Sequence, residues 1–145
     1  MKESQKVASR VMSQWKAKAK AKVPTLLIHY NQAGIPKDGP SAGLAIALLY
    51  WSQMTKTRLP HTMAVTGEIT IRGDVDPVGG IIPKFFSAIR WGVKTIFAPK
   101  QNESEWNTYL ASIEPHIRSK ITSMITIHWV SHWTECIPYL LQQRR

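Results

Sequence analysis

The stretch that decides the fold is Pro36-Lys37-Asp38-Gly39-Pro40-Ser41-Ala42-Gly43. Its glycines and prolines are typical of a loop, and the apolar residues that follow recur at helical spacing to about Thr55. We therefore expect a loop that becomes a helix at Ser41. Backbone N–H groups and the helix dipole at such a point can stabilise a developing oxyanion, which makes Ser41 a candidate nucleophile. The alternative is an ordinary N-cap, because serine is among the preferred capping residues.

Lys84 is the candidate base for such a serine. Its neighbours in the chain are apolar: Ile81, Ile82, Pro83, Phe85 and Phe86. Burial among such side chains disfavours the ammonium form, and a lysine pKa of ~10.4 must fall by roughly three units for the amine to act near neutral pH. The alternative is a surface lysine whose stem lies along an amphipathic helix.

Two further blocks extend the pattern, Thr66-Gly67-Glu68-Ile69-Thr70-Ile71-Arg72-Gly73 and Pro77-Val78-Gly79-Gly80. Together with the loop before Ser41, they resemble the conserved blocks of the Lon protease family. Lys84 follows Ser41 by 43 residues, which is the spacing of that family's Ser-Lys dyad. The resemblance continues outward to residues 1–4 and 92–100, so it covers nearly the whole chain.

The resemblance implies an α+β proteolytic domain over residues 1–145 and the activity of a serine endopeptidase. In the family, the residue that matches Ser41 attacks the peptide carbonyl and the one that matches Lys84 takes its proton. The resemblance also implies that Thr66 positions the lysine and that Asp38 has an orienting role. It implies neither a cofactor nor a metal.

The chain departs from the family pattern near the signature. Of two histidines on the strand before it, His29 is kept and Leu27 replaces the other. The acidic stretch before the signature reads Asn31-Gln32-Ala33-Gly34, and Ile82 stands where the family often has a second lysine. Because of these changes, we do not carry the family's substrate preference and regulation over to this chain. The Ser-Lys dyad itself is unchanged.

Two family modules are not recognisable in this sequence. No G-x-x-x-x-G-K-[ST] phosphate loop is present, and the β-rich opening of the proteolytic domain has no counterpart. We expect either a part of an ATP-dependent protease with an ATPase partner or a peptidase that cleaves unfolded, flexible polypeptides without ATP. The family resemblance also implies self-association, with a hexameric ring as the family's assembly.

Charge suggests a rival function from another class. Nineteen Lys and Arg against nine Asp and Glu give a net charge of +10, which favours anionic partners such as nucleic acid. The rival is therefore an idle module of the same fold that binds nucleic acid or a protein through its basic surface. Lys16, Lys18, Lys20 and Lys22 do not form one stripe, because successive side chains would lie ~200° apart on a helix.

Other bulk features restrict the setting. Cys136 is the only cysteine, which excludes an internal disulfide and is compatible with a reducing compartment. No run of eighteen apolar residues predicts a membrane span. We expect an intracellular protein of the cytoplasm or the mitochondrial matrix.

Hydrophobic periodicity and breakers predict alternating helices and strands. The strands around residues 67–74 are adjacent in the chain and interrupt strict parallel winding, so we expect mixed sheets in an α+β domain. Beyond the helix from Ser41, the expected helices are 3–20, 82–91, 102–113 and 133–141, and the expected strands are 25–30, 62–66, 68–72, 94–98 and 124–130. Asn102 with Glu105 predicts a capping box, and Pro138 should kink or shorten the last helix.

Other chemistries are weaker. A Ser-His-Asp triad has no favoured histidine among the five in the chain. His128, His132 and Cys136 would line up as metal ligands only on one helix, and the predicted strand to residue 130 separates them. Trp106, Trp129 and Trp133 are interpreted as core or interface aromatics rather than a base-stacking surface.

Overall fold

The computed structural model describes residues 2–19, 22–28 and 39–142. The helices are α1 (Lys2–Ala19), α2 (Gly43–Thr55), α3 (Ile81–Arg90), α4 (Glu103–Ser112), α5 (Pro115–Met124) and α6 (Ile137–Gln142), with short 3₁₀ turns η1 (Pro40–Ala42), η2 (Lys100–Asn102) and η3 (Trp133–Cys136). The strands are β1 (Met63–Val65), β2 (Glu68–Ile69), β3 (Val75–Asp76), β4 (Thr95–Pro99) and β5 (Thr126–Val130). None of the described helices is long and apolar enough to cross a membrane.

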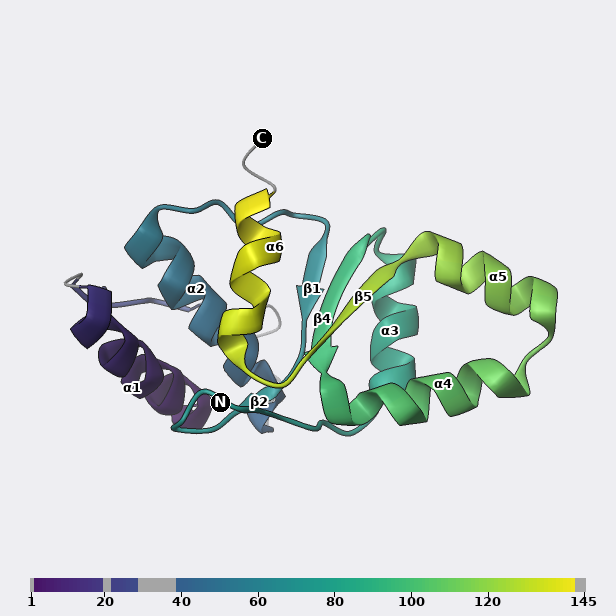
Figure 1. Cartoon of the computed structure of the whole chain (residues 1–145), viewed down its shortest axis with the longest axis horizontal. Coiled ribbons are helices and arrows are strands. Elements are labelled where there is room, and N and C mark those ends of the chain that lie inside the picture. Colours follow the sequence, from purple (N-terminus) through teal and green to yellow (C-terminus); the bar gives the residue numbers. More distant parts are fainter. Residues whose placement is uncertain (1, 20–21, 29–38, 143–145) are drawn as a thin grey trace.

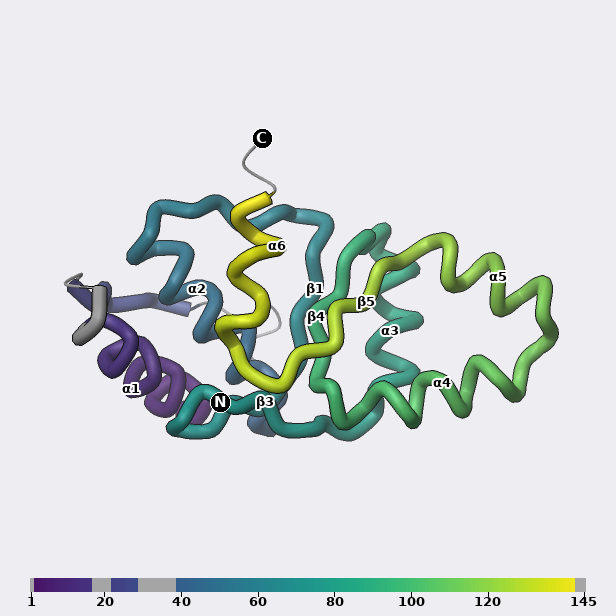
Figure 2. The backbone as a smooth tube through the Cα atoms, viewed as in Figure 1, coloured from purple at the N-terminus to yellow at the C-terminus, as the bar shows by residue number. Residues whose placement is uncertain are grey.

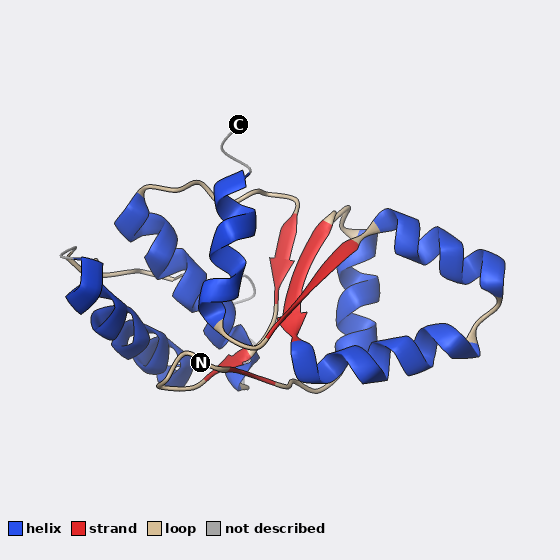
Figure 3. Cartoon of the chain, in the orientation of Figure 1, coloured by secondary structure: helices blue, strands red, loops and turns tan. Residues whose placement is uncertain are grey.

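The strands form two sheets of different type. Strands β1, β4 and β5 make a parallel sheet in that order, and β2 pairs with β3 in a small antiparallel ribbon. Figure 3 shows the parallel strands between two groups of helices, with the ribbon below them. The expected α+β class with mixed sheets is confirmed.

Each face of the parallel sheet covers its own core. Helices α1, α2 and α6 lie on one side, and α3, α4 and α5 lie on the other (Figure 1). Side chains of β4 alternate between the two sides: Phe97 packs with the α1–α2–α6 core, whereas Ile96 and Ala98 pack with the α3–α4–α5 core. This double coverage explains why four of the five β4 residues are buried.

The first two helices follow from their apolar spacing. In α1, the buried residues Ala8, Val11 and Met12 form one stripe against α2. Helix α2 is buried on most sides and ends at Lys56, whose backbone is left-handed and whose N–H donates to the Ser52 carbonyl. The tube in Figure 2 shows α6 returning to this side after β5, while α4 and α5 project away from the sheet.

Several predicted boundaries are confirmed within one to three residues, but other predictions were wrong. Residues 25–28 of the expected strand 25–30 are irregular, and residues 29–30 lie outside the described part. Leu27 is 99% exposed, and the Gln5 side-chain amide donates to the Leu26 carbonyl in place of a neighbouring strand. Helix α5 was not predicted, because Ile121 is its only buried residue and its apolar pattern is weak.

The expected strand 68–72 is shorter than predicted. It ends at Ile69, since Thr70 opens a turn in which Gly73 N–H donates to the Thr70 carbonyl. In the last region, the residues before Pro138 form the 3₁₀ turn η3, and Pro138 lies in the first turn of α6, where its missing N–H is tolerated.

The predicted capping box at Asn102 was also wrong. Asn102 precedes α4 but makes no capping bond. Its side-chain oxygen accepts from Val78 N–H at 2.9 Å, and its amide donates to the Val78 carbonyl at 3.0 Å. A buried amide thus holds the segment before α3, and this long-range pairing prevails over local capping.

Candidate active site

Ser41 is the middle residue of the turn η1. Gly39 precedes this turn, and α2 follows it directly. The capping positions are Gly39 for η1 and Ala42 for α2, and neither makes a side-chain capping bond. Ser41 is therefore not an N-cap, and its hydroxyl is not used to terminate the helix. The reading of Ser41 as an ordinary capping residue is wrong.

The backbone of Gly67 fixes the turn that carries Ser41. Gly67 N–H donates to the Ser41 carbonyl at 2.9 Å, and the Gly67 carbonyl accepts from Leu44 N–H at 3.0 Å. A Cβ atom at residue 67 would lie 2.8 Å from Cγ1 of Val75, which real Cβ atoms essentially never approach. Only glycine leaves room for this clamp between β1 and the start of α2.

Gly43 allows the other close approach. A Cβ atom there would lie 2.8 Å from Cγ2 of Ile69 and 2.9 Å from the Ile69 backbone nitrogen. The start of α2 can therefore rest directly on β2. Sequence reasoning treated Gly43 and Gly67 as parts of motifs and did not predict these contacts; a small residue in a helix's first turn was the available signal.

Lys84 lies on the opposite side of the parallel sheet, in the first turns of α3. Gly80 adopts the left-handed conformation before the helix, and the Lys84 N–H donates to the Gly80 carbonyl at 3.2 Å. Ile81 and Phe85 are buried beside it and hold this face of α3 on the sheet. Burial lowers the pKa of the Lys84 amine from its ordinary value of 10.5.

One cavity brings the predicted pair together although the two residues come from different cores. It has a volume of about 350 Å³, and its described lining residues are Ser41, Ala42, Ala45, Ala64, Val65, Thr66, Lys84, Phe85, Ser87, Ala88 and Ile96. The edge strand β1 supplies the floor, the start of α2 one wall and α3 the other. The lining is mostly small and apolar, so an amine there has few polar neighbours.

Thr66 is the third predicted residue in this cavity. It directly follows β1, is buried, and its N–H donates to the Phe97 carbonyl of β4 at 3.0 Å. This bond ties Thr66 to the parallel sheet, and Thr66 lines the same cavity as Ser41 and Lys84. No hydrogen bond of the described side chains joins Ser41, Thr66 or Lys84 to one another. Asp38 and His29 lie outside the described residues.

Two of the described histidines, His128 and His132, make contacts elsewhere in the fold. The ring of His128 stacks on Phe97, with centroids 5.0 Å apart, on the sheet face away from Lys84, and burial lowers the pKa of His128. His132 caps η3: its Nδ1 accepts from Thr134 N–H, and its Nε2 lies 3.1 Å from the Arg72 carbonyl. None of the described residues that line the Ser41 cavity is a histidine.

The cysteine and the metal-ligand spacing also have structural explanations. Cys136 is fully buried, and burial with the nearby Glu135 carboxylate raises its pKa to about 12, so the thiol stays protonated. Within residues 2–19, 22–28 and 39–142, no three His, Cys, Asp or Glu side chains are grouped as metal ligands. Trp106 and Trp133 are buried in the two cores, and Trp129 packs against the α3–α4–α5 core, as expected for core aromatics.

Comparison with known proteins identifies the family of the chain. A model of the Lon protease (S16) C-terminal proteolytic domain matches residues 1–143. The chain belongs to this family. Its Lon relatives include Lon protease from Geobacter metallireducens, 45% identical over 95 residues, which are 66% of this chain and 11% of that protein.

Other Lon relatives extend the match. Lon protease 2 from Borreliella burgdorferi is 34% identical over 128 residues, 86% of this chain and 16% of that protein. Lon protease from Malacoplasma penetrans is 44% identical over 96 residues, 66% of this chain and 12% of that protein. The chain thus spans a small part of the length of the curated Lon proteases that it matches.

Proposed function

We propose that residues 1–145 form one Lon-type proteolytic domain that hydrolyses peptide bonds with Ser41 as nucleophile and Lys84 as general base. The observation that carries this proposal is the shared cavity. It is lined by Ser41, which does not cap a helix, and by Lys84, whose pKa is lowered by burial. A lowered pKa increases the fraction of neutral amine, which is the form that can accept a proton.

The reaction runs in two halves. The neutral Lys84 amine takes the Ser41 hydroxyl proton while Oγ bonds to the scissile carbonyl carbon. The resulting ammonium then gives that proton to the leaving amine as the C–N bond breaks, which leaves an ester on Ser41. Water enters, loses a proton to Lys84 and attacks the ester, and the returning proton regenerates the Ser41 hydroxyl as the acid departs.

Backbone amides near Ser41 supply the oxyanion donors in this proposal. The amides of Gly43 and Leu44 already donate to the Pro40 and Gly67 carbonyls. We therefore assign oxyanion stabilisation to the amides of Ser41 and Ala42 at the start of the helical segment.

Thr66 is proposed as a positioning residue. Its hydroxyl is buried in the same cavity and can accept from, or donate to, the Lys84 amine as the amine changes protonation state. On the family resemblance alone, Asp38 is proposed to have an orienting role, and His29 is proposed as a supporting residue near the active site rather than as the general base.

The proposed substrate is an unfolded or flexible polypeptide. A folded chain cannot lay an extended segment between α2 and α3, so unfolding by an ATPase partner is the proposed requirement for compact substrates. Self-association, with a hexameric ring as the family's form, and an intracellular location in the cytoplasm or mitochondrial matrix are proposed on the same family grounds.

One observation favours a second function. Lys2, Lys6 and Arg10 are exposed at four-residue spacing on α1, so their side chains lie along one face beside a groove of about 570 Å³. Such a row suits a polyanion, and an idle module of this fold would bind nucleic acid there. Binding would then weaken steeply with salt, and no cleavage would depend on Ser41.

The test uses unfolded casein with and without ATP, comparing the wild type with Ser41→Ala. We expect cleavage by the wild type and its loss in the variant. Little change in thermal stability is expected, because the Ser41 hydroxyl makes no described hydrogen bond. Cleavage by Ser41→Ala at the wild-type rate would show that another residue is the nucleophile.

A further inference from the structure

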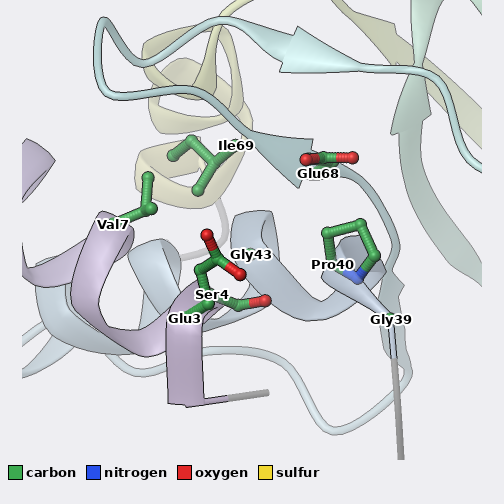
Figure 4. Close-up of a pocket in the computed structure, with 8 residues that line it drawn as sticks. All are labelled: Glu3, Ser4, Val7, Gly39, Pro40, Gly43, Glu68 and Ile69. Carbon is green, nitrogen blue, oxygen red and sulfur yellow. The ribbon is translucent and has the colours of Figure 1, made fainter.

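A second cavity lies on the other face of the turn that carries Ser41. It has a volume of about 290 Å³, and its described lining residues are Glu3, Ser4, Val7, Gly39, Pro40, Gly43, Glu68 and Ile69. Figure 4 shows Glu3 and Ser4 on the first turn of α1, Pro40 on η1 with Gly39 just before it, and Glu68 on β2 around this space. Ser41, Ala42 and Ala45 line the first cavity, so the two cavities flank one segment.

The charge of this second cavity is opposite to that of the chain. The net charge is +10, yet the described lining contains two carboxylates and no Lys or Arg. Neither Glu3 nor Glu68 has an ion pair among the described residues. Glu68 also stands directly opposite Asp76 in the β2–β3 ribbon, and like charges at opposed positions destabilise a sheet unless a cation lies between or beside them.

The Ser4 side chain is a second reason, independent of the carboxylates, to infer that this cavity binds a ligand. Ser4 is 6% exposed, and its hydroxyl makes no hydrogen bond within the described part of the chain. In Figure 4 the hydroxyl points from α1 into the space toward Pro40. Because this hydroxyl makes no bond within the described chain, it is available to accept from a donor placed in the cavity.

The remaining walls suit the stem of a long basic side chain. Val7 and Ile69 are apolar and lie beside the carboxylates, and 290 Å³ is at the lower end of small-ligand pockets, enough for one side chain. A guanidinium or ammonium group could reach Glu3, Ser4 and Glu68 while its methylene groups pack on the apolar wall.

We propose that this cavity is a substrate subsite that binds an arginine or lysine side chain of the polypeptide being cleaved. The proposal rests on the proposed peptidase function. A chain that places its scissile carbonyl at Ser41 must continue past η1, a segment roughly 10 Å across. At about 3.3 Å per extended residue, the basic residue stands about two or three positions from the scissile bond.

Cleavage of matched peptides tests the subsite. Each peptide carries one arginine, or glutamine at the same position, on either side of a fixed scissile bond. We expect the wild type to favour arginine about tenfold in kcat/KM at one position only, with a smaller lysine preference. Glu68→Gln and Glu3→Gln should each reduce the arginine-to-glutamine ratio toward one, whereas Glu114→Gln, an exposed carboxylate before α5, should retain it.

A binding measurement separates this proposal from the proposed function. N-acetylarginine amide is titrated into Ser41→Ala while backbone amide resonances are followed. We expect shifts at Ser4, Gly43 and Glu68 that N-acetylglutamine amide does not cause and that Glu68→Gln removes.

Each other outcome has one meaning. Cleavage without any arginine preference overturns the subsite and leaves the peptidase function. Binding without cleavage of any peptide removes the peptidase function and, with it, the assignment of the cation to a substrate. If Glu68→Gln lowers the sedimentation coefficient and leaves the peptide ratio unchanged, the cavity holds a basic residue of a second copy, and the proposal is wrong.

Discussion

The segment that carries Ser41 and the helix that carries Lys84 are held in place by different forces. Ser41 is positioned by backbone contacts: Gly67 clamps its turn by two hydrogen bonds, and Gly43 rests against Ile69 without room for a methyl group. Lys84 is positioned by apolar packing of α3 on the sheet, with open space around Gly79 before the helix. The position of Ser41, which we call the serine side, therefore depends on close backbone contacts. The proposed activity of Lys84, the lysine side, depends on the desolvation of its amine.

The largest effect expected from this difference is on activity at Lys84. Lys84→Arg keeps the positive charge and the packing of the stem, but a guanidinium does not deprotonate in the working range. We expect peptide cleavage to fall by roughly 10²–10⁴-fold, the usual contribution of a general base. Steady-state cleavage rates on an unfolded substrate measure this loss of activity, and circular dichroism checks that the variant is folded.

The pH profile of the wild type has a defined sign. Below the folded-state pKa of Lys84 the ammonium predominates and no base is present, so activity should rise with pH through a midpoint below 10.5. Robust cleavage by Lys84→Arg would contradict a lysine base. So would a limb near pH 6 that disappears on mutation of His29.

The next effect is on stability at the serine side. Gly43→Ala would place a Cβ atom 2.9 Å from the Ile69 backbone nitrogen, which no side-chain rotation relieves. We expect a loss of about 1–3 kcal/mol in the free energy of unfolding, as for other overpacked sites. Cleavage should fall with it because Ser41 shifts. Urea denaturation at constant m-value measures the stability.

Gly79→Ala is the matched control for that change. Apart from the residues next to it in the chain, no heavy atom lies within 4 Å of a Cβ at residue 79, so we expect a change within about 0.5 kcal/mol. Alanine at position 43 would otherwise be favoured by helix propensity over glycine. A stabilised Gly43→Ala variant would therefore show that the contact with β2 is not a constraint.

The smallest effect is on stability at the lysine side. The folded-state pKa of Lys84 is lowered, so between it and 10.5 the unfolded chain binds more protons, and the free energy of unfolding rises with pH across that window. Lys84→Met should raise stability at about pH 7, and the gain should be smaller at about pH 10. The difference should be smaller than at Gly43, since solvent screens the partly exposed amine.

Lys120→Met, at an exposed position on α5, is the control for this measurement and should show no such pH-dependent gain. Equilibrium urea curves at the two pH values suffice for both variants. If Lys84→Met gained the same free energy of unfolding at both pH values, the gain would come from packing and not from removing a desolvated charge.

Local patterns were sufficient where an element buries a regular stripe. The residues of α1, α2 and α3 show helical spacing, and β4 is a short apolar run, so these elements were predicted near their observed bounds. Helix α5 was missed because it packs mainly through Ile121. Residues 25–28 were taken for a strand because their apolar composition suits one, although a strand forms only where a neighbour pairs with it.

The sequence by itself determined the family, through long motifs in order, and with it the candidates Ser41 and Lys84. Only the tertiary structure decided that Ser41 is not a cap, because capping depends on backbone geometry and on where the hydroxyl's hydrogen bond goes. It also decided that Ser41, Thr66 and Lys84 share one cavity. These three residues line one cavity because of the strand order and because two cores pack against opposite faces of one sheet. Both features depend on long-range contacts, which no local sequence pattern encodes.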